Sequence, residues 1–520
     1  MSNRASIEKA DLVLHEGQIL GHPESDSVAV AAGTIVACGP FGDLKSLVGP
    51  QTHMIRLAGR TVAPGFIDSH LHFLEAAAAV TGAAVWRGRT IADLLADLRV
   101  AASKTPPGNW LRAFGCDEAL IRERRGPTLQ ELDQAVPRNP LRLRHQTLHA
   151  SWLNSRALKQ IKLDNPGFKA PPGAFIERDA AGRPTGLVAG MEEWIGAGLP
   201  LVTAAELESR ARTLSRELAA MGVTAFTDAT VKNGPDEVKL FVRFAQSGAI
   251  AQRIGVMVGA RHLEAAAKTV AEADQAGVRL AGIKFMPDGS HGTAAIARSV
   301  ATALARGFDC AFHVTEIEEL EWALSSIEKA RHNFGDGGAG VCRIEHGGLI
   351  PSDYIERIAA LGAWVVTNPG FIYYRGAKYA GEPGLASSLY RARSLAAAGI
   401  NLAGATDAPV TPARPLAAIA AAITRTSIEG YELAPQEALD APEALALFTV
   451  DGARLGRLKA GAFEIGRLGD LIVLPKMPLE LGPPELLNLP VDITVIGGRV
   501  VYERGRPAFA NSASAELHSG

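Results

Sequence analysis

The chain has 520 residues, of which 47% are hydrophobic and 21% are charged, as in an ordinary soluble globular protein. Lys and Arg number 53 and Asp and Glu 55, so the net charge of −2 does not indicate binding to nucleic acid or to an acidic membrane. The cysteines, Cys38, Cys116, Cys310 and Cys342, form no CxxC pair, which favours a reducing cytosol over a disulfide framework. No apolar run approaches the roughly 18 residues of a membrane span, and charges stand where a secretory signal is apolar. We expect a soluble, cytoplasmic protein.

Short apolar runs separated by glycines make up the first sixty residues and return near the C-terminus. Runs of this length between turn residues are typical of strands. Neither end has enough strands to bury a core alone, so we expect residues 1–62 and 451–507 to form one small β-sandwich. Residues 508–520 are small and polar and are expected to be a loose tail.

Residues 63–450 contain strand-like runs separated, from about residue 205, by helical segments. Eight such runs follow one another: GFIDSHLHF, VTAFTDAT, RIGVMVG, GIKFMPDG, CAFHVT, CRIEHGG, WVVTNPG and NLAGATDAP. Alternating strands and helices predict an α/β fold with a parallel sheet, and eight units indicate a (β/α)₈, TIM-like barrel. An open, doubly wound sheet stays an alternative, since periodicity does not show closure. The long gap after the first strand, about residues 75–220, is a large insertion.

The first of these runs ends in two histidines, His70 and His72, separated by one leucine. Residues i and i+2 of a strand point to the same face, so the two imidazoles lie side by side. They are either a pair of metal ligands or two polar residues on a strand end that meets solvent.

Further polar residues stand at the ends of later strands: Lys284 in the fourth, His313 in the fifth, His346 in the sixth and Asp407 in the eighth. Each alone has an ordinary structural explanation. In a barrel, however, the carboxyl ends of the strands meet at one mouth, where active sites lie. Imidazoles and a carboxylate gathered there favour Zn²⁺ or a similar divalent metal.

Lys284 has two possible roles at such a site. A protonated ammonium does not bind a cation, but an amine carboxylated by CO₂ is an anionic carbamate that bridges two metals sharing a hydroxide. Otherwise Lys284 is a structural or substrate-binding cation beside a single metal.

The stretch VAPGFIDSHLHF resembles the first-strand signature of the amidohydrolase superfamily. Over nearly the whole chain, further stretches resemble its branch of YtcJ-like metal-dependent hydrolases, amidohydrolase family 3: HASWLNSRAL, RDAAGRPTGL, GVTAFTDA, IKFMPDGSHGTA, RIEHGGLIP, ATDAPV and GRLGDLIVL. The resemblance implies a TIM-like barrel beside a β-sandwich. It also implies the metal ligands His70, His72, His313, His346 and Asp407, with Lys284 as the lysine that is carboxylated in a two-metal centre. In the fifth strand, relatives continue as HAIGDRA whereas this chain reads HVTEIEEL; this departure, which includes Glu316, concerns the substrate pocket and not His313.

The activity implied is hydrolysis of a C–N bond in a small molecule, an amide, N-acyl or N-formyl compound, carbamate or cyclic imide, by metal-activated hydroxide. Asp407 accepts a proton from the water and passes it to the leaving nitrogen. The expected metal is Zn²⁺, with Mn²⁺, Co²⁺ or Fe²⁺ as alternatives, one or two per chain. Candidate substrate contacts are His149, Asn368, Tyr374 and Arg375.

Other functions fit the same residues. A deaminase, an esterase or a decarboxylase would use the same metal centre, and a non-catalytic barrel scaffold is the alternative outside enzymes. A scaffold would be expected to have lost ligands, whereas this chain has the full set. The family resemblance also leads us to expect a homo-oligomer.

Overall fold

The computed structural model describes residues 9–80, 83–84, 90–118, 121–145, 150–165, 167–171, 173–199, 202–287, 293–335, 340–381 and 383–506. Within these ranges, no helix has both the length and the apolar character needed to cross a membrane. The chain divides into two compact units, one of residues 1–71, 215–407 and 413–520 and the other of residues 72–214 and 408–412.

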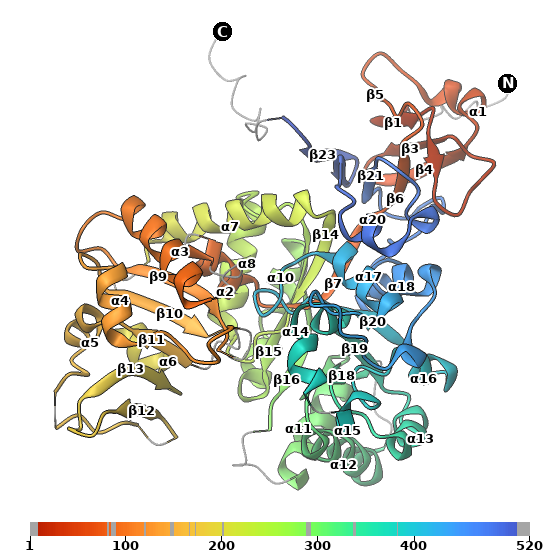
Figure 1. Ribbon diagram of the computed structural model, residues 1–520. Coiled ribbons are helices and arrows are strands. Elements are labelled where there is room, and N and C mark those ends of the chain that lie inside the picture. Colours follow the sequence, from red (N-terminus) through yellow and green to blue (C-terminus); the bar gives the residue numbers. More distant parts are fainter. Residues whose placement is uncertain are drawn as a thin grey trace, which may run out of the picture. The chain divides into compact units, whose positions relative to one another are not determined.

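The first unit contains an eight-stranded sheet in which every pair of neighbouring strands is parallel (Figure 1). Its strands follow chain order: β7 (Phe66–Leu71), β14 (Val223–Asp228), β15 (Arg253–Gly259), β16 (Val278–Phe285), β17 (Asp309–Val314), β18 (Cys342–His346), β19 (Trp364–Thr367) and β20 (Leu402–Gly404). Each lies within or across one of the eight predicted runs, so the predicted barrel is confirmed.

The first and last strands of this sheet meet just beyond β20. The Asp407 amide donates a hydrogen bond to the His70 carbonyl at 2.9 Å. The Thr406 amide donates to the Asp68 carboxylate at 3.0 Å, and the Thr406 hydroxyl donates to the same carboxylate. These bonds close the sheet, which distinguishes a TIM-like barrel from a doubly wound sheet, whose strand order reverses.

Helices separate the barrel strands: α8 (Pro235–Gln246), α9 (Leu263–Ala266), α10 (Val270–Gln275), α11 (Thr293–Ala305), α12 (Ile317–Phe334), α13 (Ser352–Ala360), α14 (Pro369–Ala380), α15 (Pro383–Ala386) and α16 (Ala392–Ala397). Helix α8 shows why they form. Its buried residues Val238, Phe241 and Val242 recur at the spacing of one helical face. Pro235 occupies the first turn, where its missing N–H costs nothing, and the Glu237 carboxylate accepts from the Gly234 amide at 2.8 Å.

After the barrel, the chain forms α17 (Pro415–Thr424), α18 (Ala441–Leu447), α19 (Val450–Leu455) and α20 (Pro483–Leu487). Two small sheets complete this unit. One consists of β4 (Thr34–Gly39), β3 (Ser27–Ala31), β1 (Leu12–His15) and β5 (His53–Arg56); the other of β2 (Gln18–Ile19), β6 (Thr61–Pro64), β21 (Leu471–Leu474), β22 (Ile493–Ile496) and β23 (Arg499–Glu503).

The second small sheet joins the two ends of the sequence. Strand β6 pairs antiparallel with β21, with Pro64 opposite Leu471, so a red strand lies beside a blue one in Figure 1. One hydrophobic cluster takes Leu12 and Val28 from the N-terminal sheet and Val473 from the C-terminal part of the chain. The predicted sandwich of both ends is therefore confirmed, while the predicted tail, residues 508–520, lies outside the described residues.

The second unit has its own sheet, ordered β12 (Phe175–Arg178), β13 (Pro184–Ala189), β11 (Ala150–Leu153), β10 (Leu141–His145), β9 (Leu111–Cys116) and β8 (Ala83–Ala84). Its helices are α2 (Phe73–Val80), α3 (Ile91–Lys104), α4 (Leu129–Ala135), α5 (Ser155–Gln160) and α6 (Glu192–Ala197), and α7 (Ala204–Ala220) leads back to the barrel. The buried Asn154 links its parts: the side chain caps α5 at the Ala157 amide and donates to the Val136 and Asn139 carbonyls.

Candidate metal centre

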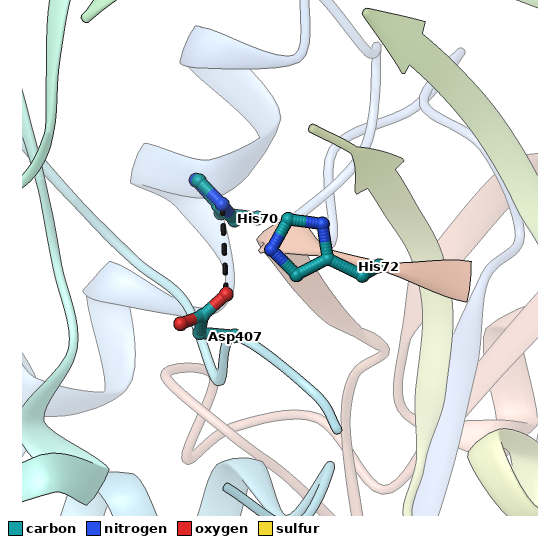
Figure 2. A group of neighbouring side chains, drawn as sticks. All are labelled: His70, His72 and Asp407. Carbon is teal, nitrogen blue, oxygen red and sulfur yellow. Dashed lines mark ion pairs between the residues drawn. The ribbon is translucent and has the colours of Figure 1, made fainter. Parts of the chain in front are cut away.

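Three of the predicted ligands form a compact group at the carboxyl end of β7. His70, His72 and Asp407 each offer one ligand atom, and these atoms all lie within 4.8 Å of one another. Figure 2 shows the imidazoles and the carboxylate facing a common space, with His70 Nε2 3.6 Å from Asp407 Oδ1. That distance is longer than a hydrogen bond and is that of a looser ion pair between the imidazole and the carboxylate.

Two more imidazoles extend the group. The His346 ring lies 4.8 Å, centre to centre, from both His70 and His313. His346 Nε2 is 3.1 Å from His313 Nδ1. Burial and the neighbouring His313 and His70 hold the pKa of His346 well below its usual range, so this imidazole is neutral and able to act as a ligand.

Lys284 lies on β16 and is only 2% exposed. Burial lowers the pKa of its ammonium to about 8, against the attraction of Glu345 and Asp407. Within the part of the chain that the structure describes, its Nζ has no hydrogen-bond partner. A buried amine in this state lacks the partner that buried polar groups normally have.

The donor set and the amine together fit a metal centre. Neutral imidazoles and a carboxylate are ligands of Zn²⁺ and related ions. Lys284 fits the same centre as a carbamate, because the carboxylated amine is an anion and is no longer a buried, unpartnered cation.

Left-handed backbone conformations occur at two of these residues. The φ angle is 69° at His346 and 58° at Asp407. Consecutive side chains of a regular strand point to opposite faces, yet Glu345 binds His70 and the next side chain, His346, also packs on His70. The left-handed residue at the strand end makes this possible, and such strain is typical of functional sites.

Hydrogen-bond partners that the sequence reasoning did not single out hold these ligands. His70 Nδ1 bonds the Glu345 carboxylate, and Glu345 is bound in turn by Arg343. Asp68 accepts from the Thr406 hydroxyl, next to Asp407, and burial raises the pKa of Asp68 to about 7. The sequence contains a signal for Asp68, because it lies two residues before His70 on the same strand face.

The predicted substrate contacts are placed as follows. His149 lies outside the described residues. Asn368 is fully buried, and its side-chain oxygen is 2.9 Å from His346 Nδ1. Tyr374 and Arg375 are half-buried on α14, with the Arg375 guanidinium 5.5 Å from the centre of the Phe371 ring. Substrate contact by these residues stays a prediction.

The residues that differ from the family pattern after the fifth strand lie at the start of α12. Glu316 is exposed and immediately precedes this helix, and its amide donates to the Glu319 carboxylate at 3.1 Å. Glu319 also accepts from the Thr315 amide at 2.6 Å. The changed residues therefore cap α12, while His313 keeps its place beside His346.

A closed parallel barrel with imidazoles, a carboxylate and a buried lysine at its carboxyl end defines a metal-dependent hydrolase fold. The family model "Amidohydrolase family" matches residues 54–502, and the chain belongs to this family. It is thus an enzyme of the amidohydrolase type.

Two relatives span nearly the whole chain. The N-substituted formamide deformylase of Arthrobacter pascens is 27% identical over 92% of this chain and 95% of its own length. The putative amidohydrolase YtcJ of Bacillus subtilis (strain 168) is 25% identical over 92% of this chain and 96% of its own length. Among solved structures, an uncharacterized metal-dependent hydrolase from Pyrococcus horikoshii OT3 has the same fold, with a TM-score of 0.70 at 20% identity, over 91% of this chain and 99% of that one.

Proposed function

We propose that this enzyme hydrolyses a C–N bond of a small molecule, an amide, N-acyl or N-formyl compound, carbamate or cyclic imide. The observation that carries the proposal is the convergence of His70, His346 and Asp407 with the buried Lys284 at one barrel mouth. The resemblance to an N-substituted formamide deformylase over 92% of the chain supports a formyl or other acyl group on nitrogen as the first substrate class to test.

The residues divide into ligands and a proton carrier. His70, His72, His313, His346 and Asp407 would hold one or two divalent ions, with Zn²⁺ the ion that this donor set favours. Lys284 would hold a second ion after its amine attacks CO₂, forming an N–C bond and releasing a proton. When bound, such an ion lowers the pKa of water to about 7 and polarises a carbonyl.

Asp407 moves the proton in this scheme. Its carboxylate, next to His70, accepts a proton from the attacking water and delivers it to the leaving nitrogen, which departs as a neutral amine. Tyr374 and Arg375 on α14, with His149 and Asn368, remain the proposed substrate contacts.

The test begins with metal content per chain in protein purified without chelator and supplied with bicarbonate. The loaded protein is then incubated with matched panels: N-substituted formamides, the corresponding acetamides, carbamates, cyclic imides, esters and aminopurines. Amine and formate release are measured. We expect amine and formate in equal amounts from a formamide, and at least a hundredfold less from Asp407→Asn.

Other outcomes contradict the proposal in distinct ways. Ammonia from an aminopurine alone indicates a deaminase, and alcohol from an ester alone indicates an esterase. Release of CO₂ without incorporation of labelled water indicates a decarboxylase. A protein that binds no metal, and is unchanged by His70→Ala, is a scaffold.

A further inference from the structure

The Glu345 carboxylate lies at the centre of a buried chain of hydrogen bonds. Glu345 is 0% exposed, on β18. One of its oxygens binds His70 Nδ1, and Arg343 donates to both oxygens, from Nε at 2.5 Å and from Nη2 at 3.0 Å. Arg343 is also buried, so its charge and that of Glu345 compensate each other away from water.

This chain of bonds crosses the interior of the barrel. Strands β18 and β7 are not neighbours in the sheet, since β19 and β20 separate them on one side. Arg343 Nη2 also donates to the Ser69 carbonyl at 3.0 Å. The pair therefore binds both the His70 ring and the backbone immediately before it, which fixes this imidazole in position and in rotation.

The same contact sets the tautomer of His70. A carboxylate accepts hydrogen bonds, so Nδ1 carries the proton and Nε2 carries the lone pair that faces Asp407. A carboxylate on one ring nitrogen raises the electron density on the other and makes it a better metal ligand.

His346 has a weaker partner. Its Nδ1 lies 2.9 Å from the Asn368 side-chain oxygen, and the Asn368 amide group donates to the Ala405 carbonyl at 3.2 Å. This arrangement orients the imidazole in the same way, but with a neutral amide in place of a carboxylate. The two histidines thus differ in the charge of the group that supports them.

We propose that Glu345 is a positioning residue for His70, and that the metal position that includes His70 and Asp407 binds its ion more tightly than the one that includes His313 and His346. The inference rests on the proposed function in requiring that the site binds two metal ions, so a single equivalent per chain overturns it. It does not depend on the substrate.

The test variant is the double substitution Arg343→Met/Glu345→Gln. Glu345→Gln alone leaves Arg343 as an uncompensated buried cation, which endangers folding. The double variant removes both charges, keeps an oxygen that accepts from His70 Nδ1, and keeps similar side-chain volumes. Zn²⁺ affinity is measured by chelator competition, and the Co²⁺-loaded protein is followed by its visible absorption.

We expect the tightest metal equivalent to bind about 10- to 100-fold more weakly in the double variant. The weaker equivalent is expected to change less than threefold, and the Co²⁺ spectrum of the first ion is expected to shift. Asp309→Asn is the matched control: it also removes a buried carboxylate bound by arginine, at the opposite end of the barrel. It should leave both affinities unchanged.

Three further results overturn the inference. One is unchanged affinity for the tightest metal in a folded double variant. Another is an equal loss at both positions, which indicates a merely structural role. The third is an equal loss in Asp309→Asn. If the double variant does not fold, Glu345→Asp is measured instead, because it keeps the charge but shortens the side chain that reaches His70. If Glu345→Asp does not selectively weaken binding of the tightest metal, the inference is rejected. Wild-type protein that binds metal but cleaves no C–N bond contradicts the proposed function alone.

Discussion

Two buried charged groups at opposite ends of the barrel, Asp309 and Lys284, differ in their partners. At the amino end, Asp309 begins β17 and is satisfied by the protein itself: Arg457 donates at 2.7 Å, Arg279 at 3.5 Å and the Val341 amide at 3.1 Å. At the carboxyl end, the Lys284 amine is buried with no hydrogen-bond partner among the described residues.

This difference indicates that the amino end of the barrel contributes mainly to stability and the carboxyl end mainly to function. Paired charges at the amino end connect the strands, and Arg253 of β15 extends the pattern by binding Asp470, beside the β-sandwich, at 3.1 Å. At the mouth, the buried Lys284 amine lacks a hydrogen-bond partner among the described residues, which lowers the stability of the fold and is typical of reactive sites. Substitutions at the amino end should therefore lower the stability and spare the activity, whereas substitutions at the carboxyl end should lower the activity and spare the stability.

The largest effect is expected from Asp407→Asn at the mouth. The amide is a poorer ligand and does not accept the proton from water, so kcat/KM should fall about 10³-fold or more. Thermal denaturation of the metal-free protein should change little. Activity within tenfold of wild type, at equal metal content, would contradict the role of Asp407.

Asp309→Asn should have the reverse profile. It leaves Arg279 and Arg457 without their buried carboxylate, and we expect a loss of roughly 2–4 kcal/mol in the free energy of unfolding. Urea denaturation measures this loss, and kcat/KM per folded molecule should stay within twofold of wild type. A large loss of kcat/KM in this variant would show that the two ends are not separate.

Lys284→Met tests whether the buried amine at the mouth lowers the stability of the metal-free protein and is needed for metal binding. Replacing a buried amine by an apolar side chain of similar length should raise the stability of the metal-free protein by about 1–3 kcal/mol. The same variant should lose one metal equivalent in bicarbonate, because no carbamate forms. Decreased stability would mean that the Lys284 amine is satisfied in the folded protein.

The smallest expected effect is on stability and comes from His145 in the insertion, which lies beside two carboxylates. Burial opposes protonation of His145, but the carboxylates of Asp117 and Glu118, 3.7 Å and 3.3 Å from its Nε2, raise its pKa to about 9. Because this folded-state pKa lies above the ordinary value of about 6.5, the stabilisation is complete below pH 6.5 and is lost as pH rises through 9.

His145→Gln should remove this pH dependence. With Glu118 half exposed, we expect a stabilisation of about 1 kcal/mol in wild type at pH 6 and none at pH 10. Melting temperatures of both proteins across this range measure the difference. Parallel profiles for the two proteins would show that the pair contributes nothing.

The barrel strands were predictable because each is a short apolar run, and all but β15 have a polar residue at or just after the carboxyl end. Strand β16 begins at Val278 rather than at the predicted Gly282, since Arg279 interrupts the apolar pattern. Reasoning from apolar patterns also missed the two residues that hold His70 by hydrogen bonds. Arg343 and Glu345 alternate with apolar residues in β18, a pattern typical of a solvent-facing edge, whereas here that face is the polar interior of the barrel.

The sheet of the insertion was not predictable for a different reason. Strand β9 pairs with β10 and β8 in parallel, while β10 pairs antiparallel with β11. Partner choice in such a mixed sheet depends on contacts between distant segments and not on local periodicity. The ligand group, by contrast, depends only on strand ends that any such barrel brings together.

The pairing of β6 with β21 has a consequence during synthesis. Strand β6 ends at Pro64, and its neighbour begins only at Leu471. At ribosomal rates of 5–20 residues per second, the edge of β6 waits about 20–80 seconds for its partner. An unpaired edge strand is a template for association with other chains. Nascent chains of this enzyme should therefore depend on chaperones, and co-expression of chaperones should raise the yield of folded protein.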